Sequence, residues 1–209
     1  MSSNKETEDN LVDWDKYHEE FAQIYNTYLK VVQPFIVQLE IMDTNFPIEI
    51  LNEIRSIFQH FAKCYAYPDP KNINKNISKA NSHLKRAILD CYKYACLSFD
   101  DEYKAFLHKY RGVDLSGVSN GDFLKDLTSK RAKAVKLLND AKYTESLSDD
   151  VVVSFNTYCE AYNAYCSVHK LINDNKQYAS AARKKQYFWK FVGFMGWAIG
   201  IALSIYLAY

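Results

Sequence analysis

The sequence predicts an all-α protein, an antiparallel helical bundle of about five helices followed by a single C-terminal transmembrane helix. Two observations point to the bundle: apolar residues recur at helical spacing through most of the chain, and only three glycines precede residue 190. A third points to the membrane helix, because residues 191–209 carry no charge. At about 1.5 Å per residue this segment would reach roughly 28 Å, close to the thickness of a bilayer's hydrocarbon core.

The composition divides the chain into four parts. Residues 1–10 are polar and are expected to be disordered, and they lack the apolar stretch of a cleavable secretory signal. Residues 11–172 are expected to form a cytosolic helical bundle. Residues 173–190 should then form a hinge and a basic juxtamembrane segment, and residues 191–209 the transmembrane helix.

The first helix is expected from about residue 10 to residue 42. Pro34 should kink or divide it, because proline lacks the backbone donor and its ring clashes with the preceding turn. The residues expected to face inward are Trp14, Phe21, Tyr25, Tyr28, Val32, Phe35 and Leu39.

Two further helices are expected, one before and one after a turn at residues 67–70. The second begins at Pro47, since proline suits the first helical position, and ends near Tyr67. Its apolar stripe consists of Ile50, Leu51, Ile54, Ile57, Phe58, Phe61 and Tyr65. The third runs from about residue 73 to residue 110, with Ile77, Ala80, Leu84, Ala87, Ile88, Cys91 and Tyr94 facing inward.

Residues 112–121 contain three of the six glycines and form the one substantial loop. A fourth helix is expected over about 122–144, and a fifth begins near Val151. From there to Ile172, apolar and aromatic residues alternate at spacings of four and three, the pattern of a heptad seam. The seam fits one wall of the bundle or an intermolecular coiled coil. Residues 173–175, Asn-Asp-Asn, are expected to be the hinge.

Small residues recur every four positions in the expected membrane helix, at Gly196, Gly200 and Ser204. This spacing lets two membrane helices approach until their backbones pack, so we expect a homo-oligomer formed through this face. The alternative is that glycine is simply common in membrane helices.

Four basic residues precede the apolar segment, and no charge follows it: Arg183, Lys184, Lys185 and Lys190. The positive-inside rule therefore places the soluble part in the cytoplasm, with these residues at the surface of the lipid bilayer. They more than account for the formal net charge of +1. The rest of the chain is mildly acidic, so a DNA partner is not expected.

The remaining composition argues against metal and cofactor chemistry. The five cysteines contain no Cys-x-x-Cys pair and lie in apolar helical patterns, which favours reduced thiols. The five histidines are scattered, and the common nucleotide-binding, zinc-protease and calcium motifs are absent. No metal site and no cofactor is predicted.

Arg55 and His60 lie on the second expected helix with four residues between them. In an all-helical bundle this R-x4-H pattern resembles the signature of the HEPN family, whose dimeric members cleave RNA with the arginine and the histidine. The resemblance implies a metal-independent endoribonuclease with Arg55 and His60 as catalytic residues, although Ser56 fits the family's polar position only loosely. On a helical wheel the two lie on opposite flanks of the apolar stripe, so they could converge only across a dimer.

The third expected helix adds His83 and Arg86. Antiparallel packing would set Arg55 level with both, and the three side chains could hold a phosphate of RNA or of a nucleotide ligand. The alternative is an Arg86–Asp90 ion pair beside a surface histidine.

Three functions follow from these patterns. The first is a non-enzymatic, membrane-anchored protein that oligomerises as a sensor, scaffold or membrane effector, for example in stress or defence. The second is a membrane-tethered HEPN-like ribonuclease, an activity linked to toxin and antiviral systems. The third is a tethering or fusion factor, suggested by a heptad segment beside a tail anchor. The absence of recognisable catalytic motifs favours the first.

Overall fold

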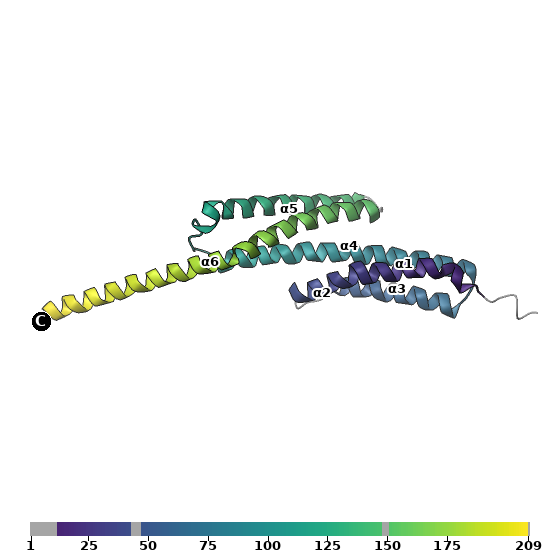
Figure 1. The fold of residues 1–209 in the computed structure, drawn as a ribbon, viewed down its shortest axis with the longest axis horizontal. Helices are drawn as coiled ribbons and strands as arrows, with labels where there is room; N and C mark the ends of the chain where they lie inside the picture. The colour runs from purple at the N-terminus through teal and green to yellow at the C-terminus, as the bar shows by residue number, and fades with distance from the viewer. Residues whose placement is uncertain (1–11, 43–46, 148–150, 209) are drawn as a thin grey trace, which may run out of the picture. The chain divides into compact units, whose positions relative to one another are not determined.

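The computed structural model describes residues 12–42, 47–147 and 151–208, and these contain helices and no strand (Figure 1). The predicted all-α class is confirmed. The segment 1–10, predicted to be disordered, and the final residue Tyr209 lie outside the described residues.

The chain forms two compact units. Unit 1 comprises the described residues up to Ser98 together with Asp140–Cys159. Unit 2 comprises Phe99–Asn139 together with the described residues from Glu160 onward.

The first long helix is divided into two. A short 3-10 turn at Trp14–Tyr17 leads into α1, His18–Thr27, and α2 follows at Gln33–Met42. Between them, Tyr28–Val32 form a π-helical turn in which the Gln33 N–H donates to the Tyr28 carbonyl. This wider turn stands just before Pro34, which has no N–H to donate and would crowd a carbonyl in a regular helix. The predicted interruption near Pro34 is confirmed.

A tight turn joins α3, Ile48–Ala66, to α4, Pro70–Lys109. Asn72 closes it, because its side-chain amide donates to the carbonyls of Lys63 and Tyr67 at 3.1 and 2.8 Å. The Asn72 backbone N–H donates to Asp69 Oδ2 at 2.9 Å. The last carbonyls of α3 and an early N–H of α4 are thus satisfied at the same place.

The buried face of α3 differs from the predicted stripe. Ile50, Ile57 and Phe61 are buried as expected, whereas Leu51, Phe58 and Tyr65 are 50%, 73% and 63% exposed. His60 and Cys64 are buried in their place. The core-facing side of α3 therefore includes the polar residue His60, which a prediction based on side-chain hydrophobicity would place on the exposed side.

Aromatic contacts join the helices of unit 1. Phe21 of α1 packs against Phe61 of α3, with ring centroids 5.0 Å apart. Tyr92 of α4 contacts Phe35 of α2 at 4.8 Å and Phe155, near the start of α6, at 5.4 Å. These rings belong to one core shared by α1 to α4 and the beginning of α6.

Unit 2 combines the end of α4, most of α5, Phe123–Leu147, and most of α6, Val151–Ala208. Phe106 packs edge-on against Phe123 at 5.7 Å, and Phe99 contacts Tyr162 at 6.0 Å. The loop between α4 and α5 contains a 3-10 turn at Val118–Gly121. Gly121 has φ +94° there, a conformation that favours glycine.

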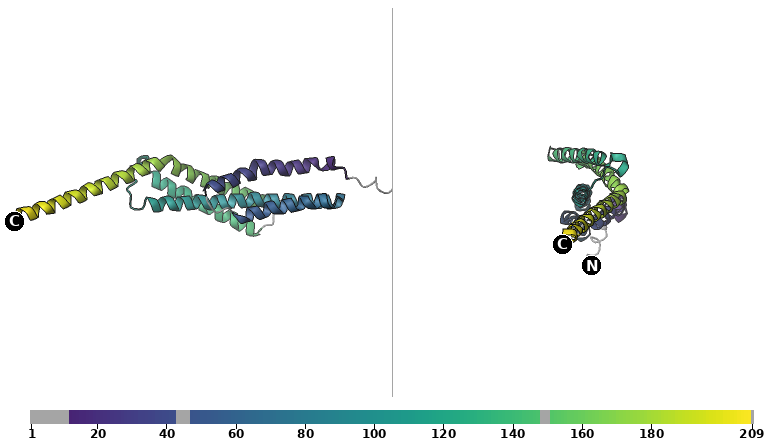
Figure 2. Two further views of the ribbon diagram at one scale, coloured as in Figure 1. Left: turned by 90° about the horizontal axis from the view of Figure 1, so that it is seen from below. Right: turned by 90° about the vertical axis from the view of Figure 1, so that its left-hand side faces the viewer.

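The predicted hinge at 173–175 is wrong, because α6 runs without a break from Val151 to Ala208 (Figure 2). Asn175 is 7% exposed, and its side-chain amide donates to the Leu171 carbonyl one turn earlier at 3.0 Å. The asparagine thus supports the helix in place of ending it. From the predicted seam, Tyr158 and Ile172 are buried, which favours the interpretation of the seam as a wall of the bundle.

The five cysteines, all within the described residues, form no disulfide. Cys64, Cys91 and Cys96 are buried, and burial raises the pKa of the Cys91 thiol to about 12. A thiol that resists ionisation is a poor nucleophile and a poor metal ligand, in agreement with core packing.

Candidate functional site

The apolar end of α6 is the feature that stands out in the structure. Ala179 is the last buried residue of the described part of α6. Beyond it, large apolar side chains lie exposed, including Trp197 at 63%, Ile199 at 54% and Leu203 at 55%. Among the described helices, only α6 is long and apolar enough to cross a membrane: its most apolar window has a mean hydropathy of 1.9, with none of that window buried. The predicted candidate span is confirmed as an unburied apolar helix.

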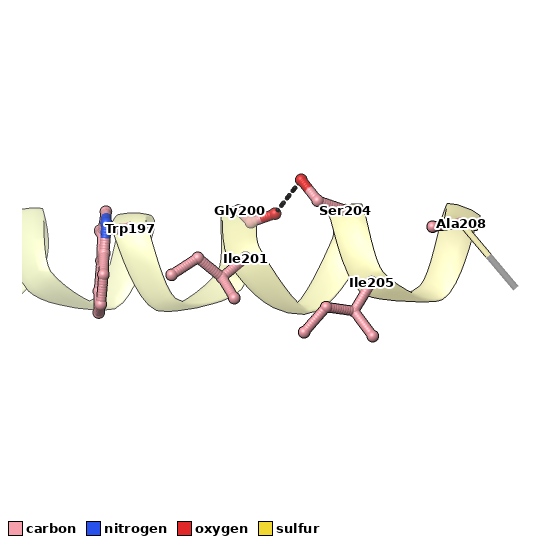
Figure 3. A pocket seen from close by; sticks show the side chains of 6 residues that line it. All are labelled: Trp197, Gly200, Ile201, Ser204, Ile205 and Ala208. Carbon is pink, nitrogen blue, oxygen red and sulfur yellow. Dashed lines mark hydrogen bonds between the residues drawn. The ribbon is translucent and has the colours of Figure 1, made fainter.

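The small residues of this segment form an open face. A Cβ atom added at Gly193, Gly196 or Gly200 would meet no atom within 4 Å. Figure 3 shows this open face of α6, along which Trp197, Gly200, Ile201, Ser204, Ile205 and Ala208 lie. The Ser204 hydroxyl donates to the Gly200 carbonyl at 2.8 Å, so its polar group is satisfied within the helix. Such a face can receive a second helix closely without leaving this hydroxyl unpaired.

The basic residues before the span occupy more than one side of α6. Lys185 and Lys190 line one hollow of unit 2, whereas Lys184 lines another, together with Lys176. The Arg183 guanidinium lies 5.6 Å from the ring centroid of Tyr187, within the range of a cation–π contact. The four charges therefore surround the helix just before its apolar part.

The structure does not bring Arg55 and His60 together within one molecule. Arg55 is exposed on α3, whereas His60 is 8% exposed and faces α4. The His60 Nδ1 lies 2.8 Å from Asn76 Oδ1. Because the Asn76 amide nitrogen donates to the carbonyl and the side-chain oxygen of Asn72, its Oδ1 accepts the proton of His60 Nδ1. Their convergence in a dimer stays a prediction.

The predicted cluster of Arg55, His83 and Arg86 needs a correction. A carboxylate faces His83: its Nδ1 lies 2.6 Å from Glu53 Oε2. Arg86 is exposed, and Asp90 pairs with Lys93 at 3.4 Å and not with Arg86. On α3, the side chain that meets His83 is therefore the carboxylate of Glu53, which stands two residues before Arg55.

Sequence reasoning missed the polar network that these residues form. The rings of His60 and His83 are stacked, with centroids 5.3 Å apart and planes 22° from parallel. The contacts therefore run from Glu53 through His83 and His60 to Asn76. A signal was present, since His60 lies three or four residues from both Ile57 and Cys64 on one helical face.

A second missed cluster lies in unit 2 around Asp100, which is 9% exposed. Arg131 Nε donates to Asp100 Oδ1 at 3.0 Å, Lys104 Nζ lies 3.0 Å from Oδ2, and the Tyr165 hydroxyl donates at 3.3 Å. Burial alone would raise the pKa of Asp100, but hydrogen bonds from Arg131 and Lys104 outweigh it and lower the pKa. The cluster joins α4, α5 and α6, so its role is to fix the three helices.

Among the described residues, no group of three His, Cys, Asp or Glu side chains is placed to hold a metal ion. The chain matches no family model, and the comparisons with curated proteins and with solved structures found no match. The HEPN resemblance therefore stays a prediction, and the exposed apolar end of α6 is the feature of the described residues that points most clearly to a function.

Proposed function

We propose that the chain is a membrane-anchored helical protein whose soluble units are held at the cytoplasmic surface and oligomerise through the end of α6. Its role would be that of a non-enzymatic sensor, scaffold or membrane effector. The observation that carries the proposal is the unburied apolar segment after Ala179. A water-soluble protein rarely exposes an apolar patch of this extent, whereas a bilayer would cover it completely.

The orientation rests on charge. Four basic residues stand directly before the apolar segment, and the described residues of that segment carry no charge. Lysine and arginine are retained on the cytoplasmic side of membrane helices, which supports a cytoplasmic location for both units.

The oligomer rests on the open small-residue face. In lipid, helices associate through close van der Waals packing, since burial of apolar surface gives no advantage over contact with lipid tails. The absence of any atom near the added Cβ positions of Gly196 and Gly200 leaves room for such packing.

The continuous α6 also suggests how a signal would reach the anchors. A partner bound to either unit would shift or rotate α6, and an unbroken helix passes such a movement to its apolar end without a hinge. This replaces transmission through the hinge expected at 173–175.

Crosslinking of the full-length protein in membranes tests the oligomer. Gly196→Leu with Gly200→Leu should abolish crosslinked species, because two added side chains separate the backbones. The matched control is Ala198→Leu with Ala202→Leu, which places the same two leucines at the same spacing on the opposite side of the helix. Equal crosslinking of the wild type and both double variants would refute association through this face.

A further inference from the structure

A hollow of about 730 Å³ lies in unit 2 directly before the apolar segment. One wall is α6, which contributes Tyr178, Lys185, Gln186, Trp189 and Lys190 together with two alanines. The other wall is the loop after α4, which contributes Asp114, Ser116, Gly117 and Val118. Neither membrane anchoring nor oligomerisation explains why this loop folds back onto α6.

Gln186 holds the loop against the helix. Its amide nitrogen donates to the Gly112 carbonyl at 2.8 Å, and its Oε1 accepts the Asp114 N–H at 2.8 Å. Both ends of one side chain are therefore used to fix one turn of the loop.

Two further contacts fix the remainder of the loop region. The hydroxyls of Tyr110 and Ser180 lie 2.7 Å apart, and the Ser119 hydroxyl donates to Asn175 Oδ1 at 2.7 Å. Val118 is buried at 3% exposure. The loop wall is thus formed before any ligand arrives, which lowers the entropic cost of binding.

The side chains of the hollow match a phosphate group next to an apolar body. Lys185 and Lys190 supply two positive charges against the single carboxylate of Asp114. That carboxylate accepts the Ser116 N–H at 2.9 Å, and the two lysines leave a net positive charge beside it. Trp189 and Tyr178 add aromatic surface with a polar tip, the side chains that concentrate where lipid headgroups meet acyl chains.

The position along α6 selects a lipid as the source of the phosphate. Lys190 immediately precedes the apolar segment, and Lys185 stands five residues earlier, about 7.5 Å along the helix axis. The headgroup layer is about 5–7 Å deep on each side of the bilayer. Both ammonium groups can therefore reach phosphates in that layer, since lysine side chains extend toward the polar interface.

We propose that this juxtamembrane pocket binds the phosphate headgroup of one anionic phospholipid, with Lys185 and Lys190 as its cationic ligands and the loop as its outer wall. The proposal rests on the membrane anchoring proposed above. It goes further, because a basic surface alone would attract many lipids loosely, whereas this pocket holds one.

Native mass spectrometry of the full-length protein in neutral detergent tests the site, with phosphatidylglycerol as the probe and phosphatidylcholine as the reference. The wild type should retain one phosphatidylglycerol in preference to phosphatidylcholine. Lys185→Gln with Lys190→Gln should weaken that binding about 25-fold, as each lysine near an anionic surface contributes roughly a fivefold factor. Gln186→Leu keeps both lysines but releases the loop, so it should also weaken binding.

Lys176→Gln with Lys184→Gln is the matched control, because it removes the same charge from another hollow on α6 that the loop does not line. It should leave phosphatidylglycerol binding nearly unchanged. Equal losses in the two lysine pairs would overturn the proposal, since attraction would then be diffuse. Displacement of the lipid by inorganic phosphate at similar concentrations would also overturn it, since the site would then bind a soluble anion. Either result leaves membrane anchoring intact, whereas an anchor failure would appear as wild-type protein that needs no detergent.

Discussion

His60 is held in the core of unit 1 by the amide of Asn76, which is itself 5% exposed. The pairing of the two residues depends on α3 and α4 lying side by side. Helical periodicity shows which face of one helix is apolar, but it does not show that a neighbouring helix will satisfy a polar group on that face. The burial of His60 was therefore beyond sequence reasoning, although its neighbours Ile57 and Phe61 were assigned correctly.

The His60–Asn76 pair gives a direct test at the residue scale. Asn76→Leu leaves the His60 Nδ1 proton without its acceptor, so we expect the free energy of unfolding to fall by about 1–3 kcal/mol. His60→Leu should have a similar effect, because it leaves Asn76 Oδ1 unpaired. The double variant removes both polar groups and should cost clearly less than the sum of the two. Additive losses in chemical unfolding of the detergent-solubilised protein would show that the pair does not interact.

Asp100 gives a prediction for pH dependence. Its pKa in the folded protein is lowered from 3.8, so its contribution to stability is present above about pH 4 and is lost as the pH falls through the folded value. Asp100→Asn should reduce the free energy of unfolding by about 2 kcal/mol at neutral pH, because charge-assisted hydrogen bonds from Arg131 and Lys104 are lost. The difference between wild type and variant should shrink as the pH falls below about 4. A difference that is constant with pH would contradict this role of the carboxylate.

At the scale of single elements, helix positions were more predictable than helix faces. The expected second helix, Pro47 to about Tyr67, agrees closely with α3, Ile48–Ala66, because proline and the following turn residues mark its ends. The exposed face of α3 was not predictable, since Phe58 is more hydrophobic than His60 but lies outward at 73% exposure. Contacts with neighbouring helices determine which of these two residues is buried.

The expected hinge in α6 failed for a related reason. Asn-Asp-Asn at 173–175 favours turns when read locally, because these side chains compete for backbone hydrogen bonds. In the structure Asn175 is enclosed, accepting from Ser119 and donating to Leu171, so the same polar group stabilises the helix. The contact between Asn175 and Ser119, in the loop before α5, could not be predicted from the sequence.

Substitutions at Asp174, an exposed position within the predicted hinge, distinguish a helix from a hinge. Asp174→Gly should lower the free energy of unfolding by about 1 kcal/mol relative to Asp174→Ala, because glycine loses more backbone entropy in a helix interior. Thermal unfolding of the two variants, followed by circular dichroism, provides the comparison. Equal stabilities would indicate that the backbone at 174 is not helical in solution.

At the scale of the whole molecule, the described residues form two compact units, and the apolar end of α6, which belongs to unit 2, is unburied. The segment was recognisable from the sequence alone, because the absence of charge over nineteen residues needs no tertiary information. The division into two units was not, since α4, α5 and α6 each contribute to both and show no break in helical periodicity where they do so.

Alkaline carbonate extraction of membranes from cells that express the full-length chain tests most directly whether the end of α6 lies in lipid. An informative variant carries Ile201→Arg and Leu203→Arg, since each arginine near the centre of a membrane helix opposes insertion by about 2.5–3.5 kcal/mol. We expect the wild type to stay in the membrane pellet until detergent is added, and the double variant to appear in the aqueous fraction. Wild-type protein released by carbonate alone, with Trp197 shielded from aqueous quenchers, would contradict the account.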